Sequence, residues 1–558
     1  MLAAAAAGRS PNAAMTGGES LFRTLLAGGV EVCFTTPPPA GTASAAMLER
    51  VRGIRFVTGF DEPSATGAAN GYARMAERPV ATLLFSGPGL AEATANLRNA
   101  ASAHLPIVNL IVDPGSPRRG AERGAERGAD RGADRGADRG AAPGIEEMAQ
   151  SYSGWLRVSA APADLGRDAA DALLAARTAP GRVASLVVPE AFLTASGGRP
   201  AAVFNPPRAP MPEVANVSRV AALLLQHAPA AVLLGTAASC GDALITAGRI
   251  AAATGATLLA PGEVRRIRRG AGLAAVERIP TPPGAARRCL GRFRLLVLAG
   301  VPAPRLEPGD HVDPGVSTAD SAAETVTLAR PEEDVPGALE ALVVALAAHA
   351  TAPRTEAERR PPPAGGAITE AGIAAVIGSL LPDQAVVADA ASPTGREIFA
   401  ACRGAPAHDW MMGPGSPGGI GLALAAGAAI ACPDRPVLCL IGEVGGAPAM
   451  QALWTMVGER RSVTVVMFTA RRMARPAETR LESPTEAARP RVSDGFVRDG
   501  FAERGPTFPA RDGVDGDRIA LAREMGVPGR RVDTLEALAE ALRGGFASGG
   551  PSLIEVPV

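Results

Sequence analysis

The sequence contains no lysine, so all 56 of its basic residues are arginines. A chain without lysine cannot form a Schiff base through a lysine amine, and it cannot hold a nucleotide with a P-loop lysine. The 56 acidic residues balance the arginines and leave a formal net charge of zero. This balance argues against bulk electrostatic binding to nucleic acid or to an anionic membrane, and we expect neither partner.

Cysteine, histidine and long apolar runs are also scarce. The six cysteines form no C-x-x-C pair and the five histidines form no H-E-x-x-H motif, which excludes the common zinc patterns. Dispersed cysteines in a large chain predict reduced thiols in a reducing compartment. No run reaches the roughly 18 apolar residues of a transmembrane helix, and residues 2–7 are too short for a secretory signal. We therefore expect a cytoplasmic protein.

The chain is 558 residues long and 47% hydrophobic, which is enough for several hydrophobic cores. Helical and strand patterns alternate along it, and repeated βα units predict an α/β fold in which mainly parallel sheets are flanked by helices. The pattern divides the chain into a loose extension, three such domains and a Pro-rich linker before the last domain. These segments are 1–14, 15–195, 212–348, 349–365 and 366–558.

Residues 119–141, within the first domain, repeat R-G-A-E or R-G-A-D with a period of four. Glycine at every fourth position disfavours a helix, and nothing apolar larger than alanine is present. The repeat is therefore interpreted as a disordered, solvated insert. Binding of nucleic acid by its arginines is disfavoured because an acid offsets each of them.

Two ordered sets of motifs carry a family resemblance. The first is GFDEP at 59–63, followed by GYAR at 71–74 and a Gly-rich SGPG turn at 86–89; the second is CPDRPVLCLIGEVG at 432–445, followed by QALW at 451–454. In this order they resemble the thiamine-diphosphate (ThDP) enzyme superfamily. The acetolactate synthase large-subunit group is most similar, with benzoylformate and pyruvate decarboxylases as relatives. The resemblance covers almost the whole chain and implies pyrimidine-binding, central and diphosphate-binding domains.

The resemblance assigns a catalytic acid to Glu62. In this family the C2 carbon of the cofactor must lose a proton to become nucleophilic, and a carboxylic acid touching N1′ of the aminopyrimidine promotes that loss. Glu62 stands at the matching position, at the end of a predicted strand and before a predicted helix. An acid buried there can have a raised pKa and donate a proton. The alternative is an ordinary exposed acid beside Asp61.

The diphosphate end is expected to bind backbone N–H groups at helix starts, with Mg²⁺ bridging it to the protein. Ser392 and Thr394, which follow a predicted strand, are candidates to touch phosphate oxygens, although turn hydroxyls would look the same. The resemblance adds further cofactor-binding positions. These are Ser86, Gly87, Gly418, Gly442, Glu443, Val444 and Gly445.

The metal motif departs from the family pattern. Glu443 replaces the family's aspartate and is one methylene longer, while Ala470 replaces an asparagine and has no side-chain oxygen. Beside Glu443, only the backbone carbonyl of Arg472 remains as a metal ligand. Because Mg²⁺ demands near-octahedral oxygen ligands at about 2.0–2.1 Å, we expect weakened binding of Mg²⁺ and ThDP. FAD is not implied.

Two further positions differ from relatives that decarboxylate 2-oxo acids. Phe85 and Pro39 stand where such relatives often carry a proton-transferring histidine or serine, and Gly418 stands where the family has a large aliphatic residue. Neither Phe85 nor Pro39 can transfer a proton. The substrate pocket is therefore expected to be unusual.

Three functions remain open from the sequence. The first is a ThDP-dependent decarboxylase and carboligase acting on a small 2-oxo acid, similar to acetolactate synthase. The second is a non-catalytic or weakly cofactor-binding homologue that serves as a structural or regulatory partner. The third is an NAD-binding oxidoreductase, which would also explain the α/β pattern. In the family the cofactor lies between the first domain of one subunit and the third of another, so a homodimer or homotetramer is implied.

Overall fold

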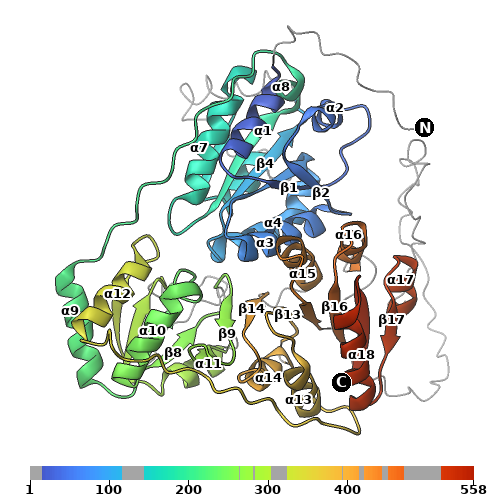
Figure 1. The fold of residues 1–558 in the computed structure, drawn as a ribbon. Coiled ribbons are helices and arrows are strands. Elements are labelled where there is room, and N and C mark those ends of the chain that lie inside the picture. Colours follow the sequence, from blue (N-terminus) through green and yellow to red (C-terminus); the bar gives the residue numbers. More distant parts are fainter. Residues whose placement is uncertain are drawn as a thin grey trace, which may run out of the picture.

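The computed structural model describes residues 15–115, 144–262, 264–280, 283–302, 323–392, 394–413, 420–442, 450–469 and 517–558. Three helix-covered sheets follow one another along the chain (Figure 1). All their paired strands are parallel except one, which confirms the predicted α/β fold. The extension at 1–14 and the repeat at 119–141 lie outside the described residues, and the domain limits drawn from the sequence stay predictions.

The first sheet has six parallel strands in the order β2-β1-β3-β4-β6-β5. Its strands are β1 Val32–Thr35, β2 Arg55–Thr58, β3 Val80–Phe85, β4 Ile107–Asp113, β5 Trp155–Val158 and β6 Val183–Pro189. Its helices are α1 Gly17–Ala27, α2 Ala43–Arg50, α3 Glu62–Ala76, α4 Ser86–Ser102, α6 Ile145–Gln150, α7 Leu165–Arg177 and α8 Glu190–Thr194. The four inner strands, β1, β3, β4 and β6, are almost entirely buried, as expected for a parallel sheet covered on both faces.

The second sheet has five parallel strands in the order β10-β8-β7-β11-β12. Its strands are β7 Ala230–Leu234, β8 Thr257–Ala260, β10 Val276–Arg278, β11 Leu295–Ala299 and β12 Glu324–Ala329. Its helices are α9 Val214–Gln226, α10 Gly241–Thr254, α11 Pro283–Leu290 and α12 Val335–Ala345. Strand β10 forms one edge of this sheet and ends at Arg278.

The third sheet has seven strands in the order β17-β18-β16-β15-β13-β14-β9. Its strands are β9 Ile267–Arg269, β13 Val386–Ala390, β14 His408–Met412, β15 Val437–Ile441, β16 Val463–Thr469, β17 Gly529–Arg531 and β18 Ser552–Pro557. Its helices are α13 Glu370–Leu380, α14 Thr394–Ala401, α15 Ile420–Ala431, α16 Ala452–Gly458, α17 Arg518–Glu524 and α18 Leu535–Ala547. Strand β9 comes from the part of the chain that forms the second sheet. It pairs antiparallel with β14 and thereby covers an edge that would otherwise carry unpaired backbone groups.

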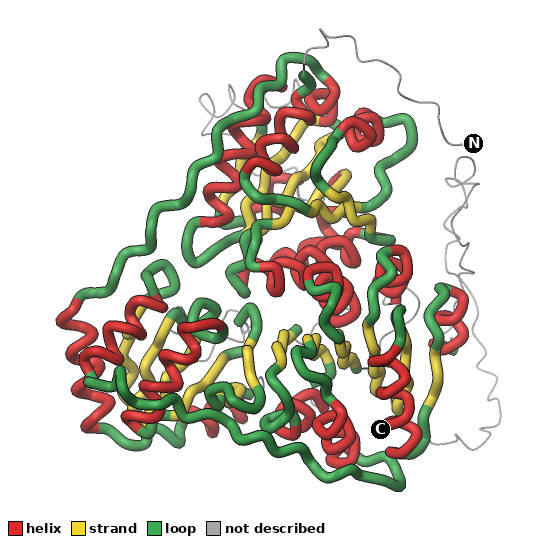
Figure 2. The backbone as a smooth tube through the Cα atoms, viewed as in Figure 1, coloured by secondary structure: helices red, strands yellow, loops and turns green. Residues whose placement is uncertain are grey.

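Helices α3 and α15 pack directly against each other and join the first part of the chain to the third (Figure 2). Glycines allow the backbones to touch. A Cβ atom on Gly71 would lie 2.0 Å from the carbonyl oxygen of Leu424, and one on Gly427 would lie 1.9 Å from that of Ala68. Any larger residue would force the helices apart. This contact fixes the helix that begins at Glu62 relative to the third sheet.

Searched for membrane spans, the described residues contain no helix that is both long enough and apolar enough to cross a bilayer.

Candidate functional site

The sequence predicted a strand that ends at Glu62, but β2 ends at Thr58 and Glu62 is the first residue of α3. The helix begins there because the Asp61 side chain accepts a hydrogen bond from the backbone N–H of Ser64 at 2.8 Å, and because Pro63 suits the first turn of a helix. The local sequence therefore sets both the position of Glu62 and the direction in which its helix runs.

The Glu62 carboxyl is half-buried between two other strand ends. Its Oε1 accepts a hydrogen bond from the Thr36 hydroxyl, just after β1, at 3.4 Å. On the other side it packs against Gly89 of α4, where an added Cβ would come within 2.3 Å of Oε1. The absence of a side chain at residue 89 thus leaves the space that the carboxyl occupies.

Burial raises the pKa of Glu62 above the ordinary value of a glutamate. A backbone hydrogen bond lowers the pKa in part, the negative charges of Glu92 and Asp61 raise it, and the Thr36 hydroxyl lowers it. The net result is a carboxyl that keeps its proton at a higher pH than an exposed glutamate does. Such a group can hold and donate a proton as a general acid.

Ser86 and Gly87 lie in the first turn of α4, directly after β3. The sequence predicted a turn at residues 86–89 before the helix, but the helix already begins at Ser86, because a proline at residue 88 is tolerated in a first helical turn. Strands β2 and β3 flank β1 on opposite sides, so the strand order reverses between β1 and β3. In open α/β sheets, ligands bind at such a reversal, outside the carboxyl ends of the strands.

The carboxyl edge of the third sheet has the same kind of reversal, between the neighbouring strands β13 and β15. Ser392 follows β13 and is exposed, Thr394 is the buried first residue of α14, and Gly442 follows β15. The fold therefore brings these three predicted positions to one edge. The other predicted positions of this half, namely Gly418, Glu443, Val444, Gly445, Ala470 and Arg472, lie outside the described residues.

A buried ion pair at this edge was missed by the reasoning from sequence. Asp389 of β13 is only 2% exposed, and its Oδ2 lies 2.9 Å from Nη1 of Arg278, at the end of β10 in the second sheet. The Trp410 indole N–H also donates to Oδ2 at 3.2 Å, and the backbone N–H of Ala391 donates to Oδ1 at 3.1 Å. The sequence does show an acid, Asp389, within an apolar strand, which could have indicated a buried charge. Its partner Arg278 is distant in the sequence, so the pair itself could not be predicted.

A second buried acid, Asp409, lies near the opposite end of the strands, where β14 begins. Three arginines contact its carboxylate: Arg266 at 3.1 Å, Arg268 at 3.0 Å and Arg435 at 2.6 Å. Two of the three come from the segment around β9. This cluster ties the second part of the chain to the third sheet, away from the edge that carries Ser392 and Thr394.

Two histidines, His104 and His408, lie near the starts of strands β4 and β14. Burial, followed by the charge of Arg269, lowers the pKa of His408 to about 3, and its Nδ1 lies 2.7 Å from the carbonyl oxygen of Pro406. Burial likewise lowers the pKa of His104. Both rings are therefore neutral near pH 7 and serve the packing of the chain.

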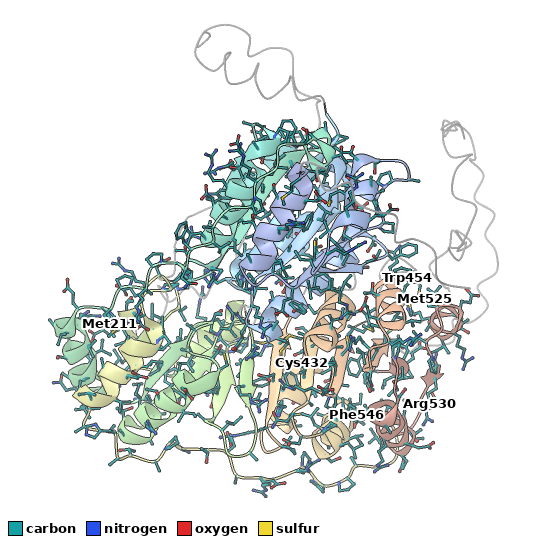
Figure 3. All side chains as sticks on the ribbon, turned by 45° about the horizontal axis from the view of Figure 1, so that its top comes forward. Met211, Cys432, Trp454, Met525, Arg530 and Phe546 are labelled. Atoms are coloured by element: carbon teal, nitrogen blue, oxygen red, sulfur yellow. The ribbon has the colours of Figure 1, made fainter. Side chains whose placement is uncertain are left out.

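The N-terminal and C-terminal halves of the fold also meet beside Glu62. Trp454 of α16, labelled in Figure 3, packs edge-on against Phe60 with 6.1 Å between ring centroids. Arg55 of β2 pairs with Glu459, the residue that ends α16. The segment that precedes Glu62 is therefore held against the helix that follows the altered metal motif.

Comparison with known proteins identifies the family. Residues 15–134 match "Thiamine pyrophosphate enzyme, N-terminal TPP binding domain" and residues 400–556 match "Thiamine pyrophosphate enzyme, C-terminal TPP binding domain". Thiamine pyrophosphate is another name for ThDP. The chain thus has the two cofactor-binding domains of a ThDP enzyme, in the expected order.

Sequence relatives define the group more closely. A protein of Mycobacterium tuberculosis H37Rv with the provisional name acetolactate synthase large subunit IlvX is 36% identical over 555 residues, which are 98% of this chain and 99% of the relative. The acetolactate synthase large subunit of Parasynechococcus marenigrum WH8102 is 29% identical over 202 residues, or 35% of this chain and 29% of the relative. The chain belongs to the ThDP-dependent enzyme superfamily and to its acetolactate synthase large-subunit-like group.

Solved structures agree on the fold. A protein of Mycobacterium smegmatis that is provisionally assigned as a ThDP-dependent enzyme superimposes on this chain with a TM-score of 0.71 at 18% identity. The ThDP-dependent 4-hydroxybenzoylformate decarboxylase of Rhodococcus jostii RHA1 superimposes with a TM-score of 0.70, also at 18% identity. Each likeness covers 98% of this chain and 99% of the other. At this identity the structures support the fold alone.

The described residues fit the aminopyrimidine end of ThDP. A half-buried carboxyl with a raised pKa lies at a strand-order reversal, beside a glycine whose Cβ would fill the space around it. The fit of the metal depends on the oxygen ligands available. At the two positions predicted to hold it, the sequence has one carboxylate, that of Glu443, and no side-chain oxygen at Ala470. The two halves of the site thus differ in how closely they match the cofactor.

Proposed function

We propose that this protein is a ThDP-dependent decarboxylase and carboligase acting on a small 2-oxo acid, in the manner of acetolactate synthase. The observation that carries the proposal is the Glu62 carboxyl, half-buried at the reversal of the first sheet with a raised pKa. Membership of the acetolactate synthase-like group supports the reaction class.

When bound, ThDP supplies a carbon nucleophile and stabilises the negative charge left by decarboxylation. Glu62 is proposed to hold a proton at N1′ of the aminopyrimidine. The Thr36 hydroxyl, which donates to Oε1 of Glu62, orients that carboxyl. Neither Phe85 nor Pro39 has a group that can carry a proton, so Glu62 is the proton-transferring residue that this proposal relies on.

For the diphosphate, the proposed contacts are the Ser392 and Thr394 hydroxyls and backbone N–H groups at residues 442–445. The reversal of strand order beside β13 supports this placement. Ser86, Gly87 and Gly418 are proposed as further cofactor contacts. Mg²⁺ is proposed to bind Glu443 and the carbonyl of Arg472, with lower affinity than an intact motif would give.

We also propose that the working unit is at least a homodimer, because in this family the cofactor bridges two subunits. Sedimentation of the purified protein at micromolar concentration should give a dimer or a larger assembly. A stable monomer that nevertheless binds ThDP would contradict a site shared between subunits.

The proposal is tested by calorimetric titration with ThDP and Mg²⁺, followed by measurement of CO₂ release from pyruvate, 2-oxobutyrate and benzoylformate. We expect saturable ThDP binding and CO₂ release from at least one of these acids. Binding without turnover of any 2-oxo acid, or no binding at all, would favour the alternative function as a structural or regulatory partner.

A further inference from the structure

We propose that Arg278, which the second sheet carries to the carboxyl edge of the third, is a diphosphate-binding residue of this protein. This inference rests on the function proposed above and adds a ligand-binding side chain to it. It assigns to an arginine hydrogen bonds to the diphosphate that do not depend on the altered metal motif.

The first observation is how firmly Arg278 is placed. It ends β10, and its side chain is 12% exposed while that of its partner Asp389 is 2% exposed. The partner is itself fixed, because Trp410 donates to Oδ2 at 3.2 Å and Ala391 donates to Oδ1 at 3.1 Å. A mostly buried guanidinium that contacts a fixed carboxylate is preorganised and loses little conformational entropy on binding an anion.

The second observation is where the pair lies. Asp389 is paired in register with Met412, the last residue of β14, so it stands at the end of the strands from which the predicted diphosphate segments leave. The start of α14 touches it as well, since a Cβ on Gly395 would come within 2.0 Å of Oδ1. The carboxylate that pairs with Arg278 is therefore next to the segment that carries Ser392 and Thr394.

The third observation is the donor capacity that remains. A guanidinium has five N–H donors in a planar fork that suits phosphate oxygens. Within the described part of the chain, Arg278 makes one hydrogen bond, from Nη1 to Asp389. Arg268 differs, because its Nη1 bonds to Asp409 at 3.0 Å and its Nη2 to Gln384 at 2.6 Å. Arg278 keeps donors for a ligand, whereas both terminal nitrogens of Arg268 are engaged.

The negative charges of the diphosphate and of Asp389 explain why a cationic side chain is useful here in addition to Mg²⁺. A diphosphate brings several negative charges to an edge where Asp389 is already buried, so an unneutralised carboxylate would repel it. Arg278 cancels the charge of Asp389 and presents N–H groups. Unlike Mg²⁺, an arginine needs no octahedral set of oxygen ligands, and so it does not depend on the side chains that Glu443 and Ala470 replace.

The experiment compares Arg278→Gln with Arg268→Gln, a matched control that also removes an ion pair between the second part of the chain and the third sheet. Each full-length protein is titrated calorimetrically with ThDP and, separately, with thiamine, which lacks the diphosphate. Arg278→Gln should weaken ThDP binding roughly ten- to a hundred-fold, the range for a lost charge-assisted hydrogen bond. It should change thiamine binding by less than about two-fold, because thiamine lacks the diphosphate that Arg278 is proposed to bind. Arg268→Gln should leave both affinities near those of the wild type.

If Arg278→Gln folds poorly by circular dichroism, Arg278→Lys takes its place, because it keeps the charge but loses the planar fork; a smaller loss that is still specific for ThDP is then expected. ThDP binding as tight as in the wild type, or equal losses for ThDP and thiamine, would overturn the role of Arg278 and leave the proposed function standing. A wild-type protein that binds neither molecule would overturn both proposals.

Discussion

The two edges proposed to hold the cofactor are built differently. At the first sheet, a single sheet and its helices supply Glu62, Thr36 and Gly89, and both Thr36 and Gly89 lie against the Glu62 carboxyl. At the third sheet, the proposed metal site has no side-chain oxygen at Ala470, and a buried ion pair reaches in from the second sheet. The proposed proton transfer and the proposed anchoring thus depend on separate sheets, and we expect residues of one to change without disturbing the other.

The largest expected effect is on the first edge. Glu62→Gln should lower the rate of CO₂ release by about 10²- to 10⁴-fold, which is the usual contribution of a positioned acid or base. The affinity for ThDP should stay within a few-fold of the wild-type value. The matched control is Glu92→Gln, which neutralises a nearby exposed acid whose charge acts on Glu62. That control should keep activity within a few-fold. Equal losses in both variants would remove the special role of Glu62.

The amino end of the third sheet offers a contrast in stability. Asp409→Asn leaves three arginines around a neutral side chain and should lower the free energy of unfolding by about 3–5 kcal/mol, as the breaking of a buried ion pair does. Urea denaturation measures this loss. ThDP affinity of the folded variant should be near that of the wild type. A variant that keeps its stability but loses ThDP binding would show that Asp409 acts in cofactor binding and not in stability.

Repair of the metal motif should sharpen the comparison. Glu443→Asp combined with Ala470→Asn restores the family's two metal-binding side chains and should tighten ThDP binding in Mg²⁺ roughly ten- to a hundred-fold. Calorimetry with and without a chelator measures the change. Tight binding that repair does not improve would mean that the chain already holds the diphosphate without those ligands. No binding by either form would mean a closed pocket.

The smallest expected effect is the pH dependence of stability. Because the folded pKa of Glu62 is raised above its ordinary value of 4.5, the folded state holds this proton more tightly than the unfolded state. Its contribution to stability is present below that value and is lost as the pH rises through the folded pKa. Glu62→Gln should therefore gain melting temperature relative to the wild type as the pH rises from 5 to 8. A constant difference would contradict a raised pKa.

Much of the fold follows from local patterns. Buried apolar strands such as β3 and β15, each followed by a helix, predict parallel sheets from the sequence alone. The position of Glu62 was also accessible, since Asp61 and Pro63 are typical of a helix start. Its half-buried carboxyl needs Thr36 and Gly89 from other strands, which no local pattern provides.

The contacts between distant parts of the chain could not be predicted from local sequence patterns. Arg278 and Asp389 are 111 residues apart and belong to different sheets, so neither reveals its partner. Strand β9 is three residues long and arginine-rich, and it pairs with a sheet formed by a later part of the chain. Such pairings depend on how whole sheets pack, which periodicity within one segment does not encode.

The most direct test of the central claim is hydrogen–deuterium exchange at C2 of bound ThDP, followed by nuclear magnetic resonance after acid quench. The wild-type protein, saturated with ThDP and Mg²⁺, should exchange this proton much faster than free ThDP in the same buffer. Glu62→Gln, saturated to the same degree, should exchange it no faster than free ThDP does. Exchange at an equal, accelerated rate in both proteins would contradict the account, because the proton chemistry would then not depend on Glu62.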